Sequence, residues 1–265
     1  KIISVDIDKN ELNKNRGLQI SHKIMQDACI FIKNILKSKK IYKANTNWIN
    51  YCNSSKKTFP LDKESEFKGE FTEIYKFIRD LSDALGSNSV IIPDDGGHLT
   101  WTMQGYKVKK GQRVFSAFGN SPMGYSLPAS IGAAFARPKS KIICIDGDGS
   151  ITINIQDLHL VKKFNLNIKI ILINNDGYGI IRQFQSLYLG KRYEASKKGI
   201  TNPNFEKVSK AFGLRYFKIN SNQKSKEIIK KALNNDGPCL CEVFIDPNQT
   251  ISPKLEFGRP IEDLS

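Results

Sequence analysis

Two apolar segments, each closed by a short polar motif, constrain the fold of this chain more than any other feature of its sequence. Residues 141–146 (KIICID) run into GDGS at 147–150, and residues 168–173 (IKIILI) run into the pair NN at 174–175. Short isoleucine-rich runs bounded by such residues are typical of buried strands. Between them, residues 154–164 place their apolar side chains on one helical stripe, so the sequence predicts a strand–helix–strand unit with parallel strands.

The two motifs are expected at one edge of a sheet, because neighbouring parallel strands end together and open α/β folds bind ligands there. The Asp148 carboxylate and the Asn175 carboxamide would meet at this edge, and both offer the oxygen ligands that Mg²⁺ prefers. A helix that begins at Gly149 and Ser150 would add backbone N–H groups and a dipole that favour a phosphate. The pattern therefore predicts a divalent cation that holds a diphosphate.

Simpler interpretations remain open at this level. Glycine, aspartate and asparagine also form ordinary turns after strands, and Asp148 alone fits a turn aspartate or a helix N-cap. Another nucleotide- or phosphate-binding α/β domain is a further alternative, but the chain has no G-x-G-x-x-G motif or P-loop after a strand.

The same motifs resemble the cofactor signature of thiamine diphosphate enzymes, in which GDG is followed after about two dozen residues by NN. This family includes decarboxylases, carboligases and acetolactate synthases. The resemblance implies a three-layer α/β/α domain with a mainly parallel, doubly wound sheet, and thiamine diphosphate and Mg²⁺ as cofactors. It implies Asp148, Asn175 and the Gly177 carbonyl as metal ligands. Further cofactor contacts would come from Gly147, Gly149, Ser150, Tyr178, Gly179 and Ile180.

An earlier loop resembles a second part of the family's site. Gly96, Gly97 and His98 follow the strand expected at residues 90–92, where family members donate hydrogen bonds to the diphosphate. Acetolactate synthases have Gly-Gln-His at this place, so Gly97 removes one side-chain donor. A histidine by itself is more often an ordinary surface or core-edge residue.

A loop at residues 119–125 resembles the third part of the site. In the family a bulky apolar side chain here holds the cofactor in a bent conformation, and the resemblance gives Met123 this role. The Ser121 backbone carbonyl would accept a hydrogen bond from the aminopyrimidine. Family members more often carry Gly-Thr where this chain has Ser121 and Pro122. If the resemblance is set aside, the alternative interpretation of Met123 is an ordinary core residue at the start of a helix.

Residues 176–184 would cover the thiazolium and form one wall of the substrate pocket. Phe184 stands where acetolactate synthases usually carry a tryptophan that helps to choose the acceptor. Residues 107–115, 202–214 and 253–265 resemble acetolactate-synthase-like proteins encoded with surface-polysaccharide genes. We therefore expect a decarboxylase or carboligase of a small 2-keto acid such as pyruvate. A keto sugar is a further candidate acceptor. The alternative function is that of a non-catalytic cofactor-binding or regulatory subunit.

The chain is expected to contain three parts. Residues 1–42, with a strand at 1–7 and a helix at 22–36, resemble the end of the family's middle domain; the polar stretch 43–68 would be a linker, and 69–265 the diphosphate-binding domain. In that domain we expect helices at 71–85, 123–135, 205–212 and 224–233, and strands at 90–92, 114–118, 215–219 and 240–246. The family's catalytic glutamate lies in a pyrimidine-binding domain that these residues do not include. We expect that domain on the same or another chain, a homodimer or tetramer joined at the cofactor, and no activity from these residues alone.

Composition excludes few classes of function. The net charge is +15, but the lysines are scattered without interleaved aromatic residues, so we predict no nucleic-acid partner. No apolar run reaches 18 residues, and we predict no membrane span. The five cysteines are odd in number and form no C-x-x-C pair, which favours free thiols in a reducing cytoplasm.

Overall fold

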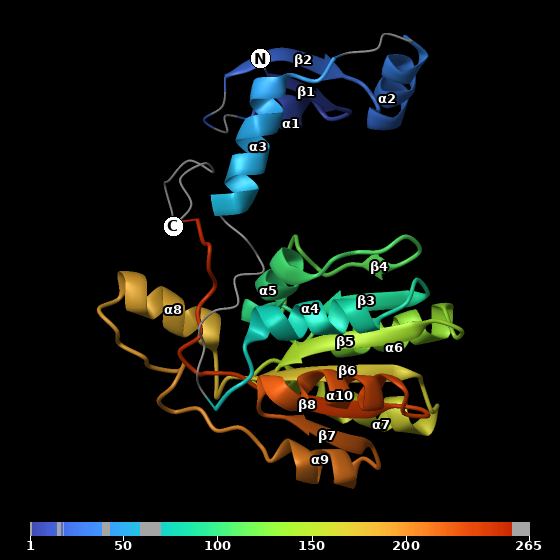
Figure 1. Cartoon of the computed structure of the whole chain (residues 1–265), viewed down its shortest axis with the longest axis vertical. Coiled ribbons are helices and arrows are strands. Elements are labelled where there is room, and N and C mark those ends of the chain that lie inside the picture. Colours follow the sequence, from blue (N-terminus) through green and yellow to red (C-terminus); the bar gives the residue numbers. More distant parts are fainter. Residues whose placement is uncertain (1, 15–16, 18, 39–42, 59–69, 256–265) are drawn as a thin grey trace. The chain divides into compact units, whose positions relative to one another are not determined.

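The structure is a computed structural model that describes residues 2–14, 17, 19–38, 43–58 and 70–255. The chain divides into two compact units, Lys1–Thr58 and Phe59–Ser265 (Figure 1). Residues 59–68 of the expected linker and 256–265 of the tail lie outside the described residues.

The first unit is a small parallel βαβ arrangement. Its elements are β1 (Ile2–Asp6), α1 (Lys9–Asn13), β2 (Ile20–Met25), α2 (Ala28–Lys37) and α3 (Thr46–Thr58). Strands β1 and β2 pair in parallel, and α1 connects them. Leu12 is the one apolar side chain that is buried among the described residues of this unit.

The helix predicted at residues 22–36 is wrong in its first part. Residues 20–25 form a strand instead, because they pair with β1, and the helix begins only after Asp27, whose carboxylate accepts from the Ile30 N–H at 3.0 Å. Residues 46–58 of the expected linker form α3, with the Asn45 side chain as its cap. The proposed three-part division of the chain remains a prediction.

The second unit contains a six-stranded parallel sheet, which confirms the predicted fold class. The strands are β3 (Ser89–Pro93), β4 (Arg113–Val114), β5 (Lys141–Gly147), β6 (Ile168–Asn174), β7 (Arg215–Ile219) and β8 (Cys239–Phe244). Their order is β4-β3-β5-β6-β8-β7, so the chain passes from β6 to the edge strand β7 before β8 enters between these two strands. Every pairing is parallel, as βαβ crossovers require.

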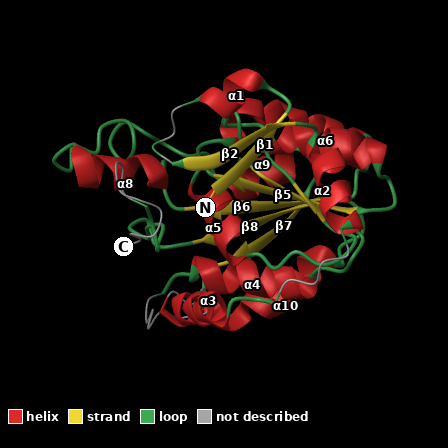
Figure 2. Cartoon of the chain, turned by 90° about the horizontal axis from the view of Figure 1, so that it is seen from above, coloured by secondary structure: helices red, strands yellow, loops and turns green. Residues whose placement is uncertain are grey.

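Helices cover both faces of this sheet. They are α4 (Ile74–Ala84), α5 (Gly97–Gly105), α6 (Ser126–Ala136), a 3₁₀ segment (Ile151–Asp157), α7 (Leu158–Lys163), α8 (Gly179–Tyr188), α9 (Phe205–Ala211) and α10 (Asn222–Leu233). One apolar core lies between the sheet and α4, α5 and α10, and the other between the sheet and α6, α7 and α9. Figure 2 shows α4 and α10 together on one side of the sheet. Alternate side chains of β5 enter opposite cores, which places a three-layer α/β/α fold around the strands.

Local hydrogen bonds explain where the predicted boundaries fail. The helix predicted at 123–135 begins at Ser126, because Gly124 has a φ of +79° and both residues donate their backbone N–H to Asp94. The helix predicted at 154–164 breaks at Asn154, whose side chain donates to the Gly124 carbonyl at 2.7 Å. The strand predicted at 114–118 is shortened to the pair with β3, and α5 and α8 were not predicted as helices.

No helix within the described parts of the chain has the length and apolar character needed to span a membrane.

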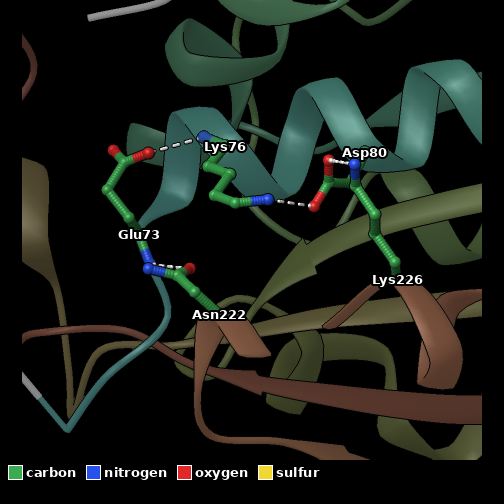
Figure 3. A network of polar contacts seen from close by, with 5 residues as sticks. All are labelled: Glu73, Lys76, Asp80, Asn222 and Lys226. Atoms are coloured by element: carbon green, nitrogen blue, oxygen red, sulfur yellow. Dashed lines mark hydrogen bonds and ion pairs between the residues drawn. The ribbon is translucent and has the colours of Figure 1, made fainter. Parts of the chain in front are cut away.

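A polar network joins α4 to α10 on one face of the sheet (Figure 3). The Glu73 carboxylate caps α4 by accepting from the Tyr75 and Lys76 N–H groups, and the Glu73 N–H donates to Asn222 at the start of α10. Asp80, which is buried, lies 2.7 Å from the Lys76 ammonium and 3.6 Å from that of Lys226.

Replacing Glu73 with alanine should lower the free energy of unfolding by about 1 kcal/mol, because the cap of α4 is lost. Chemical denaturation of both proteins would measure this difference. The control is Lys226→Ala. The Lys226 side chain is 70% exposed, so this substitution should change the free energy of unfolding by no more than about 0.5 kcal/mol. Equal stability of Glu73→Ala and the wild type would contradict the capping role.

Candidate functional site

The carboxyl ends of three neighbouring strands, β3, β5 and β6, bring the predicted motifs together. The loop after β3, the turn after β5 and the segment after β6 line one cleft, and the loop before α6 adds a further wall. The predicted contacts that line the cleft are Gly96, Gly97, His98, Met123, Ser150, Asn175, Gly177, Tyr178, Gly179 and Ile180. Parallel pairing explains this convergence, because it aligns the ends of strands that are far apart in sequence.

The glycines of the GDG motif pack directly against this cleft. A Cβ atom on Gly147 would lie 2.9 Å from Cε1 of His98, and a Cβ atom on Gly149 would overlap the ring of Tyr178. Larger residues at either position would therefore displace a side chain of the cleft. The glycines have a steric role here in addition to the turn that they form after β5.

Two consecutive aspartates hold the loop before α6. Asp94 accepts from the Gly124 N–H at 2.9 Å and from the Ser126 N–H at 2.8 Å. The neighbouring Asp95 accepts from the Ser121 hydroxyl at 2.8 Å, and Ser121 itself has a φ of 46°. Ser121 thus contacts Asp95, which lines the cleft, but it is not itself one of the lining residues, and its neighbours constrain its backbone conformation.

Asp148 is a buried carboxylate with 1% of its surface exposed, and it does not itself line the cleft, although its partner Gly177 does. Its Oδ2 accepts from the Gly177 N–H at 2.8 Å and from the Asn202 carboxamide at 2.7 Å, and its Oδ1 accepts from the Gly149 N–H at 3.0 Å. Burial raises the pKa of Asp148 to about 6, while these hydrogen bonds lower it. A cation bound beside the Asp148 carboxylate would therefore stabilise its charged form.

The segment after β6 is tightly constrained. Arg182, on α8, donates to the Asn175 carbonyl at 2.5 Å and to the Asp176 carbonyl at 2.9 Å. Gly177 has a φ of +122°, and a Cβ atom there would lie 2.6 Å from the Ser196 carbonyl oxygen. Only glycine fits this conformation and this space, so the turn presents its backbone to Asp148 in one arrangement.

His98 has an unsatisfied polar atom at the cleft. The ring is 7% exposed, and Nε2 has no hydrogen-bond partner among the residues that the structure describes. Burial lowers the pKa of His98 to about 3, so the imidazole is neutral at physiological pH. A buried polar atom without a partner costs free energy, and a ligand in the cleft would supply the missing partner.

The sequence did not predict a second group of acidic side chains, which Asp94 and Asp146 form next to His98. One ligand atom each of Asp94, His98 and Asp146 lies within 4.8 Å of the others, and all three side chains are buried. This is a candidate metal site, but the four carboxylate oxygens already accept hydrogen bonds, among them those from the hydroxyls of Ser126 and Ser150 to Asp146. Burial raises the pKa of Asp146 to about 7.

Asn202 also belongs to the site without having been predicted, whereas Arg182 was predicted only as a member of the segment 176–184. Asn202 lies 54 residues from Asp148, the residue to which it donates. A short motif or a helical period cannot reveal such a contact, because only the fold brings the two residues together. The role of Arg182 was equally hard to predict, because a single arginine after the NN pair does not show which backbone carbonyls it contacts.

Residues 94–243 match the model of a known family, the thiamine pyrophosphate enzyme, C-terminal TPP binding domain. The chain belongs to this family. The matched residues include the strand ends and loops that line the cleft, together with Asp148. The family assignment and the geometry therefore concern the same part of the chain.

Several acetolactate synthases are similar to this member of the family. The large subunit from Cyanidium caldarium is 31% identical over 265 residues, which cover 98% of this chain and 44% of the relative. The isozyme 1 large subunit from Escherichia coli (strain K12) is 30% identical over 263 residues, which cover 97% and 45%. The chain thus spans less than half the length of the curated relatives that it matches.

Proposed function

We propose that this chain holds the diphosphate of thiamine diphosphate through Mg²⁺, as part of a 2-keto acid decarboxylase or carboligase that resembles acetolactate synthase. The observation that carries the proposal is the buried Asp148 carboxylate, hydrogen-bonded to Gly177 and next to a cleft lined by Asn175. A carboxylate, a carboxamide and a backbone carbonyl are the hard oxygen ligands that Mg²⁺ takes together with phosphate oxygens.

Mg²⁺ fits the Asp148 group better than the Asp94–Asp146 group. A buried carboxylate is costly unless donors or a cation compensate its charge. Asp148 accepts from Gly177, which lines the cleft, so a metal held there could complete its shell with a diphosphate in the cleft. Hydrogen bonding does not separate the two groups, because both oxygens of Asp148 accept hydrogen bonds, as those of Asp94 and Asp146 do. The difference is that Gly177, which donates to Asp148, lines the cleft together with Asn175, and these two residues can add a carbonyl and a carboxamide oxygen. We therefore assign the metal to Asp148, Asn175 and the Gly177 carbonyl.

The rest of the cleft suits the remaining parts of the cofactor. Gly96 and Gly97 form the N-terminus of α5, and no side chain caps this helix end. The first N–H groups of the helix could therefore donate hydrogen bonds to a phosphate. The unpaired Nε2 of His98 and the Ser150 hydroxyl border the same space. Met123 lines the cleft as the proposed wedge, and the Ser121 carbonyl would accept from the aminopyrimidine.

When it is bound, thiamine diphosphate supplies the carbanion chemistry that releases CO₂ from a 2-keto acid. The residues of this chain would bind the metal, anchor the diphosphate and hold the ring orientation. The acid that protonates the pyrimidine would come from a pyrimidine-binding domain on the same or another chain, in a dimer or tetramer joined at the cofactor. We accordingly expect no turnover of pyruvate by these 265 residues without that domain.

The acceptor stays a prediction. Phe184 and Tyr188, on α8, line an apolar groove together with Ile180, which also lines the cofactor cleft. This placement supports the interpretation of residues 176–184 as a wall of the substrate pocket. A keto sugar acceptor, and membership of the group encoded with surface-polysaccharide genes, rest on the sequence resemblance alone, since the reported relatives are acetolactate synthases.

Thermal denaturation with and without ligand tests the proposed function. At about 100 times the dissociation constant, thiamine diphosphate with Mg²⁺ should raise the melting temperature by about 5–10 °C, because the ligand stabilises only the folded state. EDTA, or thiamine in place of its diphosphate, should remove the shift. A shift of equal size with thiamine alone would contradict the role of the metal and diphosphate, and stabilisation by other nucleotides only would favour a different phosphate-binding domain.

A non-catalytic cofactor-binding subunit would pass that test as well. Mixing this chain with a pyrimidine-binding domain from an acetolactate synthase and measuring CO₂ release from pyruvate would distinguish the two functions. Release of CO₂ is expected for the enzyme, whereas cofactor binding without any release would favour the regulatory subunit.

A further inference from the structure

A buried carboxylate within β8 lies outside the proposed cofactor site. Glu242 is 3% exposed and interrupts the apolar run Cys239–Phe244, in which it faces the same core as Leu172. Charged side chains are seldom buried unless partners compensate them, so its presence in this strand requires an explanation.

Both oxygens of Glu242 have partners on neighbouring strands. Oε1 accepts from the Asn174 carboxamide nitrogen at 2.6 Å, and Oε2 accepts from the Tyr216 hydroxyl at 2.5 Å. Asn174 lies on β6, at one side of β8, and Tyr216 lies on β7, at the other side. The carboxylate therefore links three adjacent strands, and its partner on β6 is the last residue of that strand, next to Asn175, which lines the cleft.

The contact fixes the orientation of the Asn174 amide. The nitrogen of the Asn174 carboxamide faces Oε1 of Glu242, and its oxygen faces away from that carboxylate. That oxygen accepts from the Asp176 N–H at 3.0 Å, and the backbone carbonyl of Asn174 accepts from the Ile245 N–H at 3.0 Å. Asn174 is thus held at both ends, and it determines how the chain turns after β6.

We propose that Glu242 is a positioning residue for the metal site, acting through Asn174. By orienting the Asn174 amide it sets the turn at Asp176, which presents Asn175 and Gly177 to Asp148. The proposal rests on the proposed function, because it assumes that these residues hold the cation. Partners of this kind behind direct ligands commonly change metal affinity by about 10–100-fold when they are removed.

The test measures metal affinity separately from stability. Mn²⁺ serves as the probe in place of Mg²⁺, and its binding to the 265-residue chain is followed by electron paramagnetic resonance at saturating thiamine diphosphate. Glu242→Leu should weaken Mn²⁺ binding about 10–100-fold, because the Asn174 amide loses its acceptor. Glu242→Gln keeps an acceptor for that amide and should restore affinity to within about 10-fold of the wild type. Asn174→Ala should match Glu242→Leu, and the double variant should be no weaker than either single variant.

Ser82→Ala is the control for a purely structural role. The buried Ser82 hydroxyl joins α4 to the Lys107 backbone, so its loss should lower stability while Mn²⁺ affinity stays unchanged. If Glu242→Leu, Glu242→Gln and Asn174→Ala bind Mn²⁺ as the wild type does, the positioning role is wrong even if stability falls. If the wild type itself binds no Mn²⁺ with thiamine diphosphate, the proposed function fails, and that result is distinct from the first.

Discussion

Replacing Asp148 with alanine should abolish the Mg²⁺-dependent binding of thiamine diphosphate. The variant loses the only carboxylate of the proposed ligand set, and the Gly177 N–H and the Asn202 carboxamide lose their acceptor. Loss of a direct ligand should exceed the 10–100-fold effects that are typical of residues behind it, so we expect affinity to fall by more than about 100-fold. Isothermal titration calorimetry with thiamine diphosphate at fixed Mg²⁺ would measure the change.

Two further variants separate charge from shape. Asp148→Asn retains an oxygen that can accept from Gly177, so it should fold like the wild type and still lose most of its affinity, because the negative charge is removed. Asp83→Ala replaces an exposed aspartate on α4 and should bind as the wild type does. Unchanged binding by Asp148→Ala would end the metal assignment. A loss seen instead in Asp94→Ala but not in Asp148→Ala would move the metal to the Asp94–His98–Asp146 group.

Replacing Gly177 with alanine should disrupt the same site for a steric reason. Its φ of +122° is strained for any side chain, and the new methyl group would lie 2.6 Å from the Ser196 carbonyl oxygen. Strain of this kind costs about 1–3 kcal/mol, and relief of the contact would shift the backbone that donates to Asp148. We expect at least a 10-fold loss of cofactor affinity in a calorimetric titration, with the sheet retained in the far-ultraviolet circular dichroism spectrum.

Gly132 provides the matched control for this substitution. It lies within α6, and an added Cβ atom would meet nothing within 4 Å. Gly132→Ala should therefore stabilise the protein by about 0.5–1 kcal/mol and leave cofactor affinity unchanged. Wild-type affinity in Gly177→Ala would show that the turn after β6 does not hold the cation.

Much of the fold was predictable because its signals are local. The isoleucine-rich runs of β5 and β6 and the glycines that follow them indicate buried parallel strands and turns within a few residues of chain. The central strands and several helices were accordingly placed to within a few residues. The helix predicted at 22–36 failed where pairing with β1 outweighed helical periodicity.

The α/β class, the central strand–helix–strand unit and the motifs at the strand ends could be predicted from the order and spacing of nearby residues. The partners of those motifs became visible only in the folded chain. Asn202 reaches Asp148 across 54 residues, and Glu242 reaches Asn174 across 68. These contacts form between strands and loops that the sheet order brings together, and no local pattern in one sequence encodes such distant pairs.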